Sequence, residues 1–97
     1  MNKEEITAAL RVKGLTATPV ETARYLDELM LGKLSDFTLI VFFKLAFPDI
    51  PLRILRETEG WNGVVKKGGG MSDSDFNELL RPWIPITSGG GTNSLPR

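Results

Sequence analysis

The sequence predicts an all-α fold, a compact bundle of four to five short helices in a single domain. Three observations support this prediction. Apolar residues make up 41% of the 97 residues, which is enough for one core. Several segments repeat apolar residues at the three- and four-residue spacing of a helix. These segments follow residues of the type that caps helix N-termini, namely Asn2, Thr18, Ser35 and Ser72.

Start and stop signals place the predicted helices along the chain. In order, they span residues 3–13, 18–31, 36–47, 50–58 and 73–81. The clearest start runs from Thr18 to Glu21, where an N-cap, a proline at the first helical position and a capping-box glutamate occur together. Glu5 completes the same kind of box at the first helix. Gly14 and Gly32 follow the first two helices and are expected to end them.

The segment 36–47 carries conflicting signals. Its run from Leu39 to Phe43 favours a strand by propensity, whereas its length and the Ser35 cap favour a helix. The sequence offers no second convincing strand, so we interpret the segment as a helix and keep a strand over 38–43 as the alternative. Because it is apolar on nearly all sides, we expect this helix to be buried at the centre of the bundle. The expected aromatic core consists of Phe37, Phe42, Phe43, Phe47, Phe76 and Trp83.

Breaking residues are concentrated in the second half of the chain. Pro48 and Pro51 end the third helix, and Asp49 is expected to cap the short fourth one. The glycine-rich stretch 60–70 is expected to form a loop. Residues 87–97 have the composition of a linker and are expected to form a flexible tail, which leaves 1–86 as a single helical domain.

The residue types that are missing bear most directly on function. The chain contains neither cysteine nor histidine, which excludes disulfides, zinc–thiolate sites and thiol catalysis and removes the commonest general base. We therefore expect no catalytic site, no metal, no cofactor and no enzymatic activity. Twelve basic residues balance 12 acidic ones, so the net positive field of a nucleic-acid binder is absent. A small DNA-binding helical module is a further alternative.

The cellular location is predicted from the apolar runs. The N-terminus has no apolar core like that of a signal peptide. The longest apolar run, Leu39 to Phe43, is far shorter than the roughly 20 residues that span a bilayer. We expect a cytoplasmic protein that does not associate with a membrane.

The leading hypothesis for function is a non-catalytic protein-binding module, either a small adaptor or an inhibitor of the immunity-protein kind. Tryptophan and arginine dominate interface hot spots, and Trp61 follows two arginines by one or two helical turns. The predicted contact residues are Arg53, Arg56, Trp61, Lys66 and Lys67. In the structural alternative, Trp61 plugs the end of the bundle. The substitution Trp61→Ala distinguishes the contact role from the plug role, because only the loss of a plug should lower the stability of the fold.

A second hypothesis is a regulator that binds an anion or a nucleotide. The loop from Lys66 to Ser72 places lysines and bare glycine amides before a helix N-terminus, a geometry that can bind phosphate. The residues assigned to this anion site are Lys67, Gly69, Gly70 and Ser72. The loop lacks the Gly-Lys-Ser/Thr ending of a P-loop, and Asp73 and Asp75 already occupy the positive end of the helix.

Overall fold

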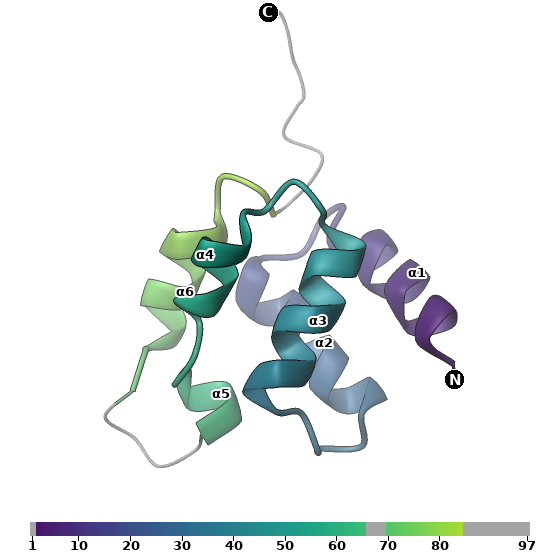
Figure 1. Ribbon diagram of the computed structural model, residues 1–97, viewed down its shortest axis with the longest axis horizontal. Helices are drawn as coiled ribbons and strands as arrows, with labels where there is room; N and C mark the ends of the chain where they lie inside the picture. The colour runs from purple at the N-terminus through teal and green to yellow at the C-terminus, as the bar shows by residue number, and fades with distance from the viewer. Residues whose placement is uncertain (1, 66–69, 85–97) are drawn as a thin grey trace, which may run out of the picture.

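The computed structural model describes residues 2–65 and 70–84, and these residues form α-helices and no strand (Figure 1). The helices are α1 (Lys3–Lys13), α2 (Pro19–Leu29), α3 (Asp36–Ala46), α4 (Leu52–Arg56), α5 (Asn62–Val65) and α6 (Asp73–Leu80). The all-α prediction is confirmed, and so is the choice of a helix over a strand for the third segment. The predicted tail, 87–97, lies outside the described residues.

The four predicted N-caps are confirmed. Asn2 and Thr18 each form a complete capping box with the glutamate three residues later. Ser35 and Ser72 each accept a hydrogen bond from the backbone N–H three residues on, at the starts of α3 and α6. These starts depend on contacts within one turn of chain, which is why they can be predicted locally.

The end of α2 was predicted two residues too late. Leu31 and Gly32 both have left-handed backbone angles, with φ of 59° and 79°. The Gly32 N–H donates to the Asp27 carbonyl at 2.8 Å, which closes the helix behind Leu29. Left-handed geometry suits Gly32 but is unfavourable for a leucine. The last helix likewise ends one residue early, at Leu80.

The predicted fourth helix, 50–58, is shorter than expected, and its predicted cap is wrong. α4 begins only after Pro51, and no side chain caps it. Lys44 holds the preceding corner in a non-helical shape, because its ammonium donates to the carbonyls of Pro48 and Ile50 at 3.0 and 2.8 Å. Ile50 is buried at this corner instead of opening a helix.

Helix α5 was not predicted, because a loop was expected there. Its start is held by backbone bonds to a distant segment: the Asn62 N–H donates to the Met71 carbonyl, and the Met71 N–H donates to the Gly60 carbonyl. These bonds join residues about ten apart in sequence and leave no local pattern.

The helices surround one core. α1 packs against α2 and α3, α2 against α6, and α3 against α4. In the view of Figure 1, α3 stands in front of α2, with α1 on one side and α4, α5 and α6 on the other. Large side chains that are fully buried include Leu10, Leu26, Leu39, Phe43, Leu55, Trp61, Phe76 and Ile84.

As predicted, α3 is the central helix of the bundle, but it is not covered on all sides. Only its inner face is covered, through Leu39, Phe42, Phe43 and Ala46. Phe37, which was expected in the core, is 76% exposed. Trp83 is half-buried at the edge of the core rather than inside it. The six described helices of this small domain leave one side of α3 uncovered.

Candidate functional site

Trp61 lies at the centre of the first candidate site and is buried. Its side chain is 1% exposed, its ring centroid lies 4.4 Å from that of Phe76, and its indole Nε1 donates to Asp73 Oδ1 at 2.9 Å. The Arg24 guanidinium covers it, 5.8 Å from the ring centroid. This burial favours the structural alternative, in which Trp61 is a plug, over a role as a partner contact.

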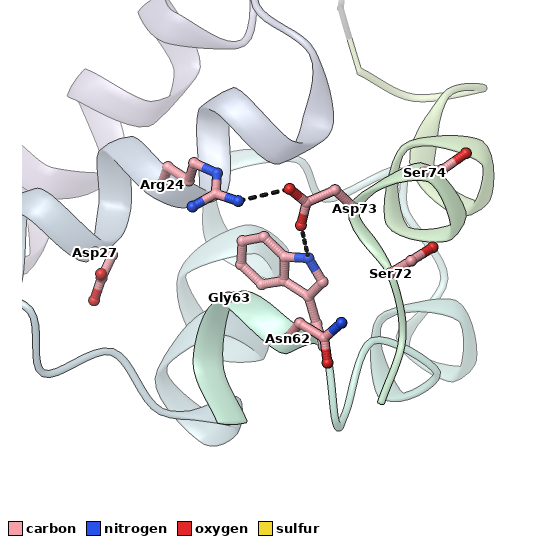
Figure 2. A pocket seen from close by; sticks show the side chains of 8 residues that line it. Arg24, Asp27, Asn62, Gly63, Ser72, Asp73 and Ser74 are labelled. Carbon is pink, nitrogen blue, oxygen red and sulfur yellow. Dashed lines mark hydrogen bonds and ion pairs between the residues drawn. The ribbon is translucent and has the colours of Figure 1, made fainter. Parts of the chain in front are cut away.

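The covered tryptophan forms the floor of a concave site of about 560 Å³. Its lining residues are Arg24, Asp27, Trp61, Asn62, Gly63, Ser72, Asp73 and Ser74. Figure 2 shows Arg24 and Asp73 pointing toward one another across this site, whereas Asp27 and Ser74 lie on either side and do not converge on the pair.

The ion pair between Arg24 and Asp73 sets the electrostatics of the site. The two side chains meet at 2.6 Å and remain 56% and 48% exposed. The hydrogen bond from Arg24 holds the pKa of Asp73 below its usual value; burial opposes this shift, and the bond from the Trp61 indole adds to it. The Asp73 carboxylate is thus charged and already paired with a cation.

Two glycines shape the backbone around the indole. A Cβ at Gly63 would lie 2.3 Å from the Trp61 ring, and a Cβ at Gly70 would lie 1.9 Å from the Gly60 carbonyl oxygen. Neither position has room for a side chain. Gly63 therefore allows close packing against the Trp61 ring, and Gly70 allows the close approach of the Gly60 backbone.

Two polar residues of this site are already engaged in hydrogen bonds within the fold. Ser72 caps α6, and Asp73 is bound to Arg24 and Trp61, so neither is poised as a nucleophile or a base. Within residues 2–65 and 70–84, no three acidic side chains gather closely enough to hold a metal ion.

The predicted anion site is only partly described. Lys66, Lys67 and Gly69 lie outside the described residues. The Gly70 N–H donates to Asn62 Oδ1 at 3.2 Å, and Ser72 Oγ accepts from the Asp75 N–H at 3.1 Å. The two described members are therefore engaged in internal hydrogen bonds.

The two predicted arginine contacts lie on α4. Arg53 and Arg56 are both exposed, and neither lines the concave site over Trp61. In the described part of the chain, neither side chain has a hydrogen-bond or ion-pair partner. The structure thus separates the predicted contact residues into a buried tryptophan and two free guanidinium groups on a different helix.

The structure also exposes an apolar surface that sequence reasoning missed. Phe37, Val41 and Leu45 follow one another at four-residue intervals, so they share one face of α3. Phe37 is 76% exposed, Leu45 is 42% exposed and Val41 is half-buried. We call these three residues the outer α3 face. The sequence signal for this surface is the apolar character of the whole segment 36–47. That signal does not indicate which side of the helix stays exposed in the fold.

The comparisons with known proteins give no further guide to function, because no protein-family model, curated protein or solved structure matches the chain. In the described ranges, the helices are all too short or too polar to cross a membrane.

Proposed function

We propose that this protein is a non-catalytic protein-binding module, of the adaptor or inhibitor kind, and that the outer α3 face is its contact surface. The observation that carries the proposal is the exposure of Phe37, Val41 and Leu45 along a single helix face. A surface helix normally places polar residues on the side away from the core. Apolar side chains aligned there are typical of interaction sites, and aromatic residues are enriched in them.

The position of Leu31 supports the same interpretation. Leu31 lies in the turn between α2 and α3 and is 83% exposed, so it adds nothing to the core. Its left-handed φ of 59° disfavours a leucine by about 1–2 kcal/mol relative to the ordinary helical region. Glycine or asparagine would fit this turn with less strain. A leucine that is both strained and exposed is better explained by contact with a partner than by stability.

The experiment that tests the proposal is affinity capture with matched variants. The tagged full-length chain is incubated with extract from its source organism, in parallel with Phe37→Ser and with Leu52→Ser. Leu52 is half-exposed on α4, a different helix, so it controls for the loss of an exposed apolar side chain. Mass spectrometry identifies the retained proteins, and circular dichroism verifies that each variant is folded.

We expect one protein to be retained by the wild type and by Leu52→Ser and to be lost with Phe37→Ser. Retention of the same proteins by all three chains would refute the assignment of the outer α3 face. Retention of nucleic acid alone would refute protein binding and favour the DNA-binding alternative. Arg53→Glu with Arg56→Glu tests the arginine contacts separately. Microscopy of the tagged chain tests the cytoplasmic location that belongs to this proposal.

A further inference from the structure

We propose that two copies of this chain associate through α1, in a two-fold symmetric, antiparallel pairing. The surface is a groove of about 470 Å³ between α1 and the end of α3. It is lined by Lys3, Glu4, Thr7, Ala8, Arg11 and Leu45. We call it the α1 groove. The inference goes beyond the proposed function, because it names a second surface and a different partner; the two surfaces share only Leu45.

The groove presents a self-complementary row of side chains. Glu4, Ala8 and Arg11 are spaced by four and then three residues, which puts them on one face of α1, and all three are exposed. The acid is near the start of the helix, the base is near its end, and the small alanine lies between them. When two such helices cross antiparallel beside Ala8, Glu4 of each copy lies opposite Arg11 of the other.

The charges of this row are available for that pairing. Glu4 has no ion pair or hydrogen bond through its side chain in the described part of the protein. Glu4 and Arg11 lie about 10 Å apart along the helix axis, too far to pair within one copy. Arg11 donates from Nε to the Ala46 carbonyl at 3.1 Å and from Nη2 to the Leu45 carbonyl at 3.5 Å. These bonds hold the guanidinium in place while other N–H groups stay free for a carboxylate.

The surroundings of the crossing point suit close approach of two helices. Thr7 and Ala8 are small, so the helix backbones can come near each other. Leu45 lines the groove beside them and is 42% exposed. Its burial in the pairing removes apolar surface from water. A surface that pairs with itself through opposite charges and exposed aliphatic side chains is the kind a two-fold dimer requires.

Charge reversal tests the pairing through its symmetry. The molecular mass of the full chain is measured by sedimentation over a range of concentrations, for the wild type, Glu4→Arg, Arg11→Glu and the control Glu57→Arg, at the end of α4 and outside the α1 groove. We expect the wild type and the control to dimerise. Each groove variant alone should raise the dimer dissociation constant by about tenfold or more, because like charges then face each other.

Mixing the two groove variants gives the most specific outcome. One chain then carries two basic residues in the row and the other carries two acidic ones, so a mixed dimer regains both ion pairs. We expect dimerisation to return on mixing. A wild type that remains monomeric at every concentration, or groove variants that dimerise as well as the control, would overturn the proposal.

A cross-linking experiment covers the case in which Arg11→Glu fails to fold. The natural chain has no cysteine, so a single Ala8→Cys reports only on its own neighbourhood. Near the two-fold axis, the two thiols should form an intermolecular disulfide under mild oxidation, whereas Glu57→Cys should not. Equal cross-linking of both variants would refute the arrangement. Because the capture experiment above varies Phe37, outside the α1 groove, either proposal can fail while the other stands.

Discussion

Replacement of Trp61 by alanine is the most direct test of the structure. The ring is fully buried, stacks on Phe76 and donates a hydrogen bond to Asp73. Buried Trp→Ala changes destabilise proteins by about 3–5 kcal/mol, through lost burial and the cavity left behind. For a domain of this size each kcal/mol corresponds to about 4–8 °C in Tm, so we expect Tm to fall by about 12 °C or more.

The assay is urea and thermal unfolding followed by circular dichroism, on Trp61→Ala and on Phe37→Ala as a matched aromatic control. Phe37 is 76% exposed, so its removal should change the unfolding free energy by about 0.5 kcal/mol or less. A Trp61→Ala variant that is as stable as the control would falsify the buried position of the indole. It would also restore Trp61 to the list of partner contacts, as the sequence first indicated.

Three further predictions concern neighbouring features. Gly70→Ala should lower the unfolding free energy by about 1–3 kcal/mol, because its Cβ would overlap the Gly60 carbonyl oxygen; an unchanged urea midpoint would contradict this. Leu31→Asn should raise stability by about 0.5–1 kcal/mol in the same assay, since asparagine tolerates the left-handed backbone, and no gain would show that the turn is unstrained. The lowered pKa of Asp73 means that its stabilising effect is complete above its unfolded pKa of about 3.9 and is lost as pH falls through the folded value. Asp73→Asn should therefore lower the unfolding free energy by about 1 kcal/mol or less at neutral pH, because the pair with Arg24 is half-exposed. The variant should also lose less stability than the wild type as the pH falls below about 4. If both proteins lose stability equally at acid pH, the pair does not contribute.

The starts of the helices are the part of the fold that local chemistry decides. A serine, threonine or asparagine side chain bonds an N–H within its own turn, so Asn2, Thr18, Ser35 and Ser72 were recognisable without any knowledge of the rest of the molecule. The cap expected at Asp49 failed because Lys44, a residue on the preceding helix, holds the corner in another shape.

The candidate sites depended on contacts that join distant residues. Trp61 in the sequence fits either a plug or a contact residue, since both use an aromatic ring beside glycines. The choice was made by Phe76, Asp73 and Arg24, which come from α6 and α2 and close over the indole. Helix α5 likewise exists through bonds between Asn62 and Met71.

The sequence by itself determined the all-α class, most helix limits to within two residues, and the absence of histidine and cysteine chemistry. It did so because helical periodicity, capping and side-chain inventory are local or compositional properties. Only the tertiary structure decided which side of an apolar helix is covered and which is left open. Nearly every side of α3 is apolar, and it is the packing of α1 and α4 on α3, with Phe76 of α6 against Phe43, that covers Phe43 and leaves Phe37 in water.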